Sequence, residues 1–377
     1  MIACPHRPPC SACPRFGEPG IAAPALAALN ALASRAGLPP VEVVGGPALG
    51  FRARARLAIR GRQGAPKLGL FEPGSHRLVT IPNCPIQHPL INEVAAEIRR
   101  CLADARVPPY SDLAHQGLAR YLQIVVERAS RTAQVVVVAN APSAAPLEAC
   151  LALIRERLGS RLHSLWFNAQ TAPTNTILGP TFEHVAGDAF LVERYGDRAD
   201  ICYPPGAFGQ SNPAVATAII DCLEAGIPEG ARVAELYGGV GAIGLSLFPR
   251  LSHLAINELN PHSLAGLAQG LERLDPALRA RVQVFPGAAG EALEAVEGAE
   301  AVIADPPRKG LDAPLREHLA ARPPRQLWYI ACGLDAFLAD AAHLLSGGRL
   351  RLAALTAFDL MPYTGHVETV ARFDAAG

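Results

Sequence analysis

The stretch VAELYGGVGAIGL, residues 233–245, contains the pattern that decides the fold: an apolar run, a glycine-rich turn and the beginning of a helix. The run includes Glu235, and Gly238, Gly239 and Gly241 follow it. Glycines let the backbone approach a ligand closely, and the free N–H groups of a helix N-terminus can bind one. The spacing differs from the GxGxxG fingerprint, which disfavours a nicotinamide site; an ordinary tight connection stays an alternative.

Short apolar runs alternate with amphipathic stretches on both sides of this turn. We expect helices over residues 213–226, 242–251, 261–274, 290–296, 313–321 and 335–345, and strands over residues 231–238, 253–259, 281–285, 299–307 and 326–331. This alternation predicts an α/β, Rossmann-like, doubly wound domain with a mostly parallel sheet. Such sheets bind ligands beyond the carboxyl ends of their strands.

The first half of the chain has a different pattern. It contains expected helices over residues 23–36, 90–105 and 146–159, strands within residues 50–82, a hairpin of YLQIVVER and AQVVVVAN, and strand-like segments 164–170 and 174–179. This pattern predicts an α+β domain with antiparallel strands. We place the two domains at residues 1–190 and 191–377, with helix 23–36 a candidate to pack on the second.

The composition of the chain restricts the classes of protein to which it can belong. The 377 residues are half hydrophobic, no stretch approaches 18 uninterrupted apolar residues, and the N-terminus lacks an apolar core of signal-peptide length. We therefore expect a cytosolic chain without a membrane span. Lys plus Arg equals Asp plus Glu at 34 each, without the basic surplus that many nucleic-acid binders carry.

One local cluster of positive charge stands out in the sequence. Arg52, Arg54 and Arg56 alternate with small apolar residues, so a strand would place all three on one face. That face is a candidate for phosphate contacts, with a merely solvated face as the alternative.

Three chemically notable residues follow expected strands of the second domain. Glu258 in INELNP ends the strand after the glycine turn, where an acidic residue can bind a ribose; a solvated loop carboxylate is the alternative. Asp305 in VIADPPRKGLD ends an apolar strand before two prolines redirect the chain. Cys332 in LWYIACGLD precedes a helix that we expect to lower the pKa of its thiol, although a lone cysteine is often a small buried hydrophobe.

Near the C-terminus, LMPYTGHVETVARF places His366 and Glu368 two residues apart on an expected strand. Both side chains should then face the same side. Glu368 is a candidate general base; two polar residues on an edge strand are the alternative.

Nine cysteines in a cytosolic chain argue against a disulfide framework. Cys4, Cys10 and Cys13 crowd the N-terminus, and Cys84 stands in NCP. Three close thiols and one remote thiol suit a four-thiolate site for zinc or an iron–sulfur cluster.

Together these motifs resemble the class I SAM-dependent RNA 5-methyluridine methyltransferase family, over nearly the whole chain. The resemblance rests on FGQSN (Phe208, Gln210, Asn212), the glycine turn, NELNP, DPPRKG, the Cys332 strand and HVET in that order. The 23S ribosomal RNA branch of the family also carries a 4Fe–4S cluster on C-x5-C-x2-C plus a later Cys-Pro. Cys4, Cys10, Cys13 and Cys84 match that spacing.

The resemblance implies an RNA (uracil-C5)-methyltransferase, a monomer acting on ribosomal RNA or tRNA. Cys332 would be the nucleophile and Glu368 the base. The implied S-adenosylmethionine (SAM) site comprises Gln210, Tyr237, Gly238, Gly239, Gly241, Glu258 and Asp305, with Asp305 touching either base or cofactor. The implied substrate contacts are Phe208, Asn212, Arg308 and His366.

The chain departs from the family pattern at three places. Ala331-Cys332-Gly333-Leu334 replaces Ser-Cys-Asn-Pro, Ala288 stands where an acidic residue is common, and Tyr-Gly-Gly replaces Cys-Gly. Two alternatives stay open: an amino-group methyltransferase that uses the DPPR loop, and a SAM- or RNA-binding protein of this fold with altered catalysis.

Overall fold

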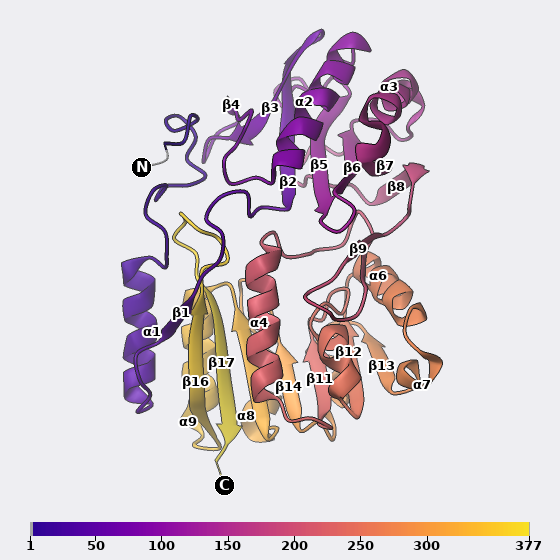
Figure 1. Ribbon diagram of the computed structural model, residues 1–377. Helices are drawn as coiled ribbons and strands as arrows, with labels where there is room; N and C mark the ends of the chain where they lie inside the picture. The colour runs from indigo at the N-terminus through magenta and orange to yellow at the C-terminus, as the bar shows by residue number, and fades with distance from the viewer. Residues whose placement is uncertain (1–2, 377) are drawn as a thin grey trace. The chain divides into compact units, whose positions relative to one another are not determined.

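The computed structural model describes residues 3–376, and the chain divides into two compact units. The first unit comprises residues 3–17, 47–193 and 204–206, and the second comprises residues 18–46, 194–203 and 207–376. Helix α1 (Ala23–Arg35) therefore belongs to the second unit although it precedes most of the first in sequence (Figure 1).

The second unit is built on an eight-stranded sheet in the order β1-β16-β17-β15-β14-β11-β12-β13. Its strands are β1 (Glu42–Val44), β11 (Arg232–Leu236), β12 (His253–Glu258), β13 (Val282–Pro286), β14 (Ala301–Ala304), β15 (Gln326–Ala331), β16 (Leu350–Phe358) and β17 (Glu368–Ala375). Neighbours are parallel except at β17, which is antiparallel to both β15 and β16. The expected mostly parallel, Rossmann-like sheet is confirmed.

Helices connect these strands. They are α4 (Pro213–Gly226), α5 (Gly244–Leu247), α6 (Pro261–Glu272), α7 (Pro276–Arg279), α8 (Ala313–Ala321) and α9 (Leu334–Ser346), with 3₁₀ turns η3 (Phe248–Arg250) and η4 (Leu293–Val296) and a short strand β10 (Ile201–Tyr203). Asn260 caps α6, because its side-chain oxygen accepts from the N–H groups of His262 and Ser263 at 2.9 and 3.2 Å. Proline at the first position then fixes a helical φ.

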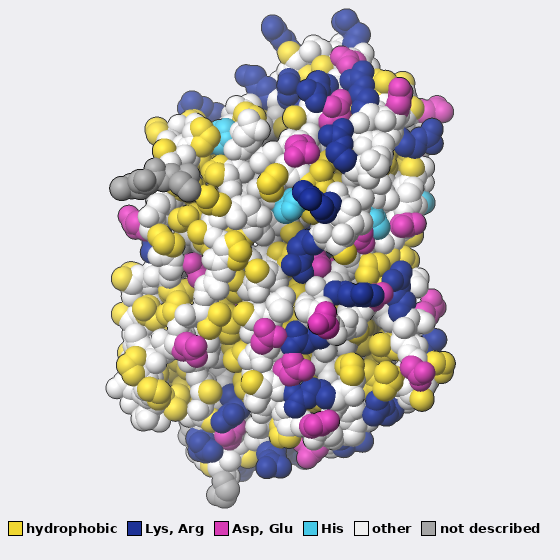
Figure 2. Space-filling view, in the orientation of Figure 1, with side chains coloured by type: hydrophobic (Ala, Val, Ile, Leu, Met, Phe, Trp, Pro, Cys, Tyr) yellow, Lys and Arg dark blue, Asp and Glu magenta, His cyan; other side chains and the backbone are white. Residues whose placement is uncertain are grey.

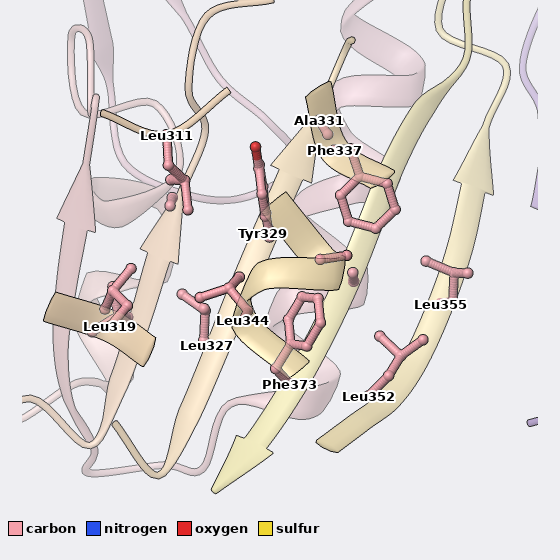
Figure 3. Close-up of a cluster of buried hydrophobic side chains, with 14 of the residues drawn as sticks. Leu311, Leu319, Leu327, Tyr329, Ala331, Phe337, Leu344, Leu352, Leu355 and Phe373 are labelled. Carbon is pink, nitrogen blue, oxygen red and sulfur yellow. The ribbon is translucent and has the colours of Figure 1, made fainter. Parts of the chain in front are cut away.

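The core of the second unit lies between its sheet and the helices that cover it. Figure 3 shows Tyr329 and Leu327 of β15, Phe373 of β17 and Phe337 and Leu344 of α9 packed together. Strands β14 and β15 are buried along almost their whole length. This explains their continuous apolar sequences, since a parallel strand covered on both faces has no polar side.

The first unit contains a seven-stranded sheet in the order β4-β3-β2-β5-β6-β7-β8. Its elements are β2 (Arg54–Arg62), β3 (Ala65–Phe71), β4 (Leu78–Thr80), α2 (Pro89–Asp104), β5 (Ala119–Glu127), β6 (Thr132–Ala139), η1 (Ala145–Leu147), α3 (Glu148–Leu158), η2 (Gly159–Arg161), β7 (Leu162–Ala169), β8 (Thr181–Gly187) and β9 (Leu191–Glu193). The pairs are antiparallel except β6 with β7. That pair is parallel because α3 carries the chain back across the sheet between them.

Three expected elements of regular structure differ in the protein. Residues 174–179 form an irregular loop, not a strand, because buried side chains bind its carbonyl groups: the Arg120 guanidinium donates to Thr174 O at 3.0 Å and the Asn168 amide to Gly179 O at 2.9 Å. The expected helices 242–251 and 290–296 shrink to α5 with η3 and to η4. Pro249 lacks the N–H that a longer first helix would need.

The surface carries charges of both signs. On the face drawn in Figure 2, Lys and Arg side chains are interspersed with Asp and Glu, in keeping with the equal totals of 34. Among residues 3–376, no helix combines the length and apolarity needed to cross a bilayer.

Candidate functional site

The chemically notable residues of the second unit gather where its parallel strands end. Tyr237 follows β11, Glu258 ends β12, Asp305 follows β14 and Cys332 follows β15. These four strands are neighbours in the sheet, so one edge presents all four residues.

The glycine turn after β11 requires its glycines. A β-carbon on Gly238 would lie 2.6 Å from the Ile256 side chain, and one on Gly241 would lie 2.8 Å from Leu267. Gly239 and Gly241 also have positive φ values of 60° and 78°. The turn is thus compact, with its backbone packed against the neighbouring elements.

Glu235 organises this turn, a role that the sequence interpretation did not assign to it. Its side chain is 2% exposed, and its carboxylate accepts from Gly244 N at 2.9 Å. Burial raises the pKa of Glu235 to about 8, and the charges of Asp305 and Glu258 act in the same direction. An acidic residue near the end of an apolar strand was the signal available in the sequence.

Glu258 lies over the same turn. Its carboxylate accepts from Gly239 N at 2.7 Å and from Asn260 N at 2.5 Å. Tyr237, at a φ of 59°, donates its hydroxyl to the Asp312 carboxylate at 3.2 Å and accepts from Asp312 N at 3.0 Å. The Tyr237 hydroxyl therefore ties the glycine turn to the loop that follows β14, and the ribose contact of Glu258 stays a prediction.

Cys332 is electrostatically coupled to the predicted base. Burial raises the pKa of the Cys332 thiol above its ordinary value, and the charges of Glu368 and Asp305 raise it further, while Arg308 lowers it. The expected lowering by the following helix was wrong in direction, because two nearby carboxylates and burial outweigh it.

The two carboxyl groups beside Cys332 are themselves perturbed. Burial raises the pKa of Asp305 to about 7. The pKa of Glu368 lies well above its ordinary value because the side chain is buried and Asp305 is close; Arg308 partly offsets this. Cys332, Asp305, Glu368 and Arg308 therefore form one interacting group, which we call the Cys332 cluster.

His366 and Glu368 do not share a strand face as expected. β17 begins at Glu368, which is 5% exposed, whereas His366 precedes the strand and is exposed. Partial burial and Arg308 lower the pKa of His366, so it still lies near the exposed Arg308. The turn before β17 separates the two residues that simple alternation would align.

The FGQSN segment divides into exposed and buried residues. Phe208 is 69% exposed and Gln210 is half-buried, so both are accessible. Asn212 is fully buried: its amide donates to Leu360 O at 3.1 Å and its oxygen accepts from Val215 N at 3.4 Å. The structure thus assigns Asn212 to capping α4, in place of the predicted substrate contact.

The three arginines of the first unit do not act as one free phosphate-facing row. Arg52 lies near the thiols of Cys13 and Cys84, and its backbone N–H donates to Ile86 O at 2.9 Å. Arg56 donates to the Gln123 side chain at 2.8 Å. Arg54 is half-buried and alternates with buried Ala53 and Ala55, as the strand pattern predicted.

The four cysteines of the predicted metal site approach one another within the first unit. Burial raises the pKa of Cys13 to about 11, and charges on Cys84, Cys10 and Cys4 add to this. All four are free thiols. Among residues 3–376, however, no group of three or more His, Cys, Asp or Glu side chains is arranged to hold a metal ion. The predicted metal site is not confirmed.

Comparison with solved structures establishes the class of fold. The crystal structure of the tRNA (uracil-54, C5)-methyltransferase of Pyrococcus abyssi, in complex with S-adenosyl-L-homocysteine, matches with a TM-score of 0.75. The match covers 93% of this chain and 82% of that one at 23% identity. The protein therefore has a methyltransferase fold.

Sequence relatives then identify the family. An uncharacterized RNA methyltransferase of Protochlamydia amoebophila is 34% identical over 381 residues, covering 99% of this chain and 97% of that protein. The 23S rRNA (uracil(1939)-C(5))-methyltransferase RlmD of Chromohalobacter salexigens is 30% identical over 353 residues, covering 91% and 69%. No family model matches the chain. The chain belongs to the RNA methyltransferase family, as its motifs predicted.

Proposed function

We propose that the protein methylates C5 of a uridine in RNA, with SAM as methyl donor and Cys332 as nucleophile. The observation that carries this proposal is the Cys332 cluster: a thiol, two carboxyl groups and a guanidinium interact at the sheet edge that also holds the glycine turn. An amino-group methyltransferase would need no thiol there.

Cys332 begins the reaction. C5 of uracil is a weak nucleophile, and addition of the Cys332 thiolate to C6 moves the C5–C6 π electrons toward the C4 oxygen. SAM supplies the methyl group that the resulting enolate attacks through C5. Arg308, which favours the charged form of the Cys332 thiol, stabilises the thiolate before attack. The target uridine must leave its stack to reach this position.

Glu368 ends the reaction. After methyl transfer, C5 carries both a methyl group and its original hydrogen. Glu368 takes that proton, the C5–C6 double bond re-forms, and the bond from C6 to the Cys332 sulfur breaks. Its position beside Cys332, and a pKa raised well above its ordinary value by burial and Asp305, suit a base that accepts and then releases a proton.

The remaining second-unit residues suit binding of SAM and RNA. Gly239 leaves open space at the sheet edge, and Gly238 and Gly241 allow the turn to pack closely beneath it; Glu258 would bind the ribose, with Gln210 and Asp305 as further proposed contacts. Tyr237 holds the turn against the loop that carries Arg308. Exposed Phe208 offers an aromatic surface for a base, and His366 supports the substrate side.

Trapping tests the proposed function. RNA containing 5-fluorouridine has no C5 proton to lose, so wild-type protein with SAM should form a stable Cys332-linked adduct. Cys332→Ala should form none, whereas Cys222→Ala, which removes a half-buried thiol of α4, should behave as wild type. Methyl transfer by Cys332→Ala would favour the amino-group alternative, and RNA binding without any transfer would favour a protein with altered catalysis.

We further infer that Cys4, Cys10, Cys13 and Cys84 hold a 4Fe–4S cluster. Their mutual electrostatic effect and the C-x5-C-x2-C spacing with a later Cys-Pro support a common site. Nothing in the uridine chemistry requires an electron, so the cluster would be structural.

Metal analysis tests the cluster. Protein purified without oxygen should be brown and contain iron and acid-labile sulfide, and Cys84→Ser should lose both. Cys101→Ser, which changes a buried thiol of α2, is the matched control. Zinc without sulfide would refute the iron–sulfur assignment.

The comparisons include enzymes that act on ribosomal RNA and on tRNA, and one of these two substrate classes fits this chain better. We propose ribosomal RNA, because the RlmD relative acts on 23S rRNA and the cysteine spacing matches that branch; the Pyrococcus abyssi enzyme acts on tRNA. We also propose a monomer acting in the cytosol. Mapping the 5-methyluridine missing from RNA of a deletion strain would identify the target.

A further inference from the structure

A cavity of about 340 Å³ lies in the first unit, and none of its lining residues is among those assigned above to SAM or to the target uridine. Helix α2 and strands β2, β3 and β4 contribute its walls, and Figure 1 shows these elements. Its volume is at the small end of the roughly 300–1,000 Å³ range of ligand sites. This is enough for one base and part of its backbone, but not for a folded RNA element.

One amide that lines the cavity has donor and acceptor groups that no other described protein group uses. Gln87 is 6% exposed and lines the cavity, yet its side-chain amide has no hydrogen-bond partner among residues 3–376. The residue as a whole is almost covered, but its amide is not among the buried side-chain groups left without a partner, so it meets the water of the cavity and can exchange that water for a ligand. An amide offers one donor group and one acceptor, the pair that matches the edge of a nucleobase.

Two cations stand at the cavity without acidic neighbours. Lys67 of β3 and Arg99 of α2 are exposed lining residues, and neither forms an ion pair within the described part of the chain. No lining residue is acidic. The combination favours an anionic ligand whose phosphate meets the two cations while its apolar part contacts side chains such as Ile81.

We propose that this cavity binds one unstacked nucleotide of single-stranded RNA outside the target uridine. Gln87 pairs with the edge of the base, and Lys67 and Arg99 contact its phosphates. Recognition of splayed-out bases is the common mode for single-stranded RNA. The proposal rests on RNA as the substrate of the proposed function, but not on the chemistry of Cys332.

A second cavity of the first unit provides the matched control. It has nearly the same volume, about 330 Å³, and contains Arg155, but Glu148 also lines it. A cation accompanied by a carboxylate should not attract phosphate. Arg155→Gln therefore tests whether any loss of RNA binding reflects charge alone.

The experiment measures binding of 5′-labelled RNA pentamers of each base to the full-length protein. Gln87→Leu should weaken the tightest pentamer about tenfold. Lys67→Gln with Arg99→Gln should lower the slope of log affinity against log salt by about 1.4, the value for two single-strand phosphate contacts. Arg155→Gln should change neither quantity.

Ala96→Leu provides a second variant, which removes no polar group and no buried side chain. Ala96 is exposed on α2 and lines the cavity, so the larger side chain fills space without breaking a bond, and it should also weaken the pentamer. Unchanged pentamer affinity in Gln87→Leu and Ala96→Leu, or an equal loss in Arg155→Gln, would overturn the proposal. Cys332→Ala should bind the pentamers normally, so a failure of the uridine chemistry is distinguishable from a failure of this site.

Discussion

Gly333 lies directly against the backbone of Arg308: a β-carbon on Gly333 would be 2.5 Å from the Arg308 carbonyl oxygen. The φ of Gly333 is −115°, so its backbone conformation is open to any residue, and only this contact excludes a side chain. The Gly333 that departs from the family pattern is therefore what allows the loop after β14 to reach the Cys332 turn.

Gly333→Asn, which introduces the family residue, should displace Arg308 and slow formation of the Cys332 adduct. Misplacement of a catalytic group by about 1 Å can cost about 10²-fold, and we expect a loss of that order. The rate of adduct formation with 5-fluorouridine RNA measures it. Gly347→Ala is the control, because a β-carbon there meets nothing within 4 Å. An unchanged adduct rate would show that Arg308 can shift freely.

Glu368→Gln should stall the enzyme after methyl transfer. Without the base, the C5 proton stays in place and Cys332 cannot leave, so a covalent complex should accumulate even with ordinary RNA. Loss of a general base typically costs about 10²–10⁴-fold in turnover. Denaturing electrophoresis detects the complex. Free methylated RNA released at the wild-type rate would assign the proton transfer to another group.

Sequence patterns predicted the sheet of the second unit because the burial of each strand leaves its mark in that strand's own residues. Strands such as β14 and β15 are buried on both faces, so their apolar runs are unmistakable, and proline at helix starts marks where α4 and α6 begin. Strand β16 was not identified separately, and its mixed burial explains why.

Side-chain roles that depend on distant partners were not predictable in the same way. Asn212 looked like a substrate contact, but its amide binds Leu360, 148 positions away. The helix after Cys332 suggested a lowered pKa, and burial of the thiol together with Glu368 from another strand reverses that effect. Such contacts arise from the order of strands in the sheet, which spacing along the chain does not specify.

The loop after β14 should owe its position to Asp340 of α9. This carboxylate is 3% exposed and accepts from the Tyr329 hydroxyl at 2.7 Å, from Leu311 N at 2.9 Å and from Arg316 at 3.1 Å. Tyr329→Phe should lower the free energy of unfolding by about 1 kcal/mol, the value of one hydrogen bond.

Asp340→Ala should lower the free energy of unfolding by about 3–5 kcal/mol, because it leaves Arg316 and two other donors without their acceptor. Asp335→Asn, at an exposed site of the same helix, should change it by less than about 0.5 kcal/mol. Denaturant titration measures all three variants. Equal stabilities for Asp340→Ala and Asp335→Asn would show that the loop holds its position without this carboxylate.

The reactivity of Cys332 should continue to increase at pH values at which an ordinary thiol is already fully ionised. Its raised pKa means that the protonated thiol persists to higher pH, so the reactive thiolate appears only as pH rises. Asp305, whose pKa is about 7, is already negative at the pH at which the thiol ionises, so it opposes a second negative charge on Cys332. Asp305→Asn should therefore move the midpoint of thiol ionisation to lower pH, and Arg308→Gln should move it to higher pH, because the guanidinium favours the thiolate.

The rate of iodoacetamide alkylation of the Cys332 peptide, followed by mass spectrometry across pH, reports the thiolate without RNA or SAM. If both variants shifted the midpoint in the same direction, the charges around Cys332 would not control its ionisation, and the cluster would lose its electrostatic basis.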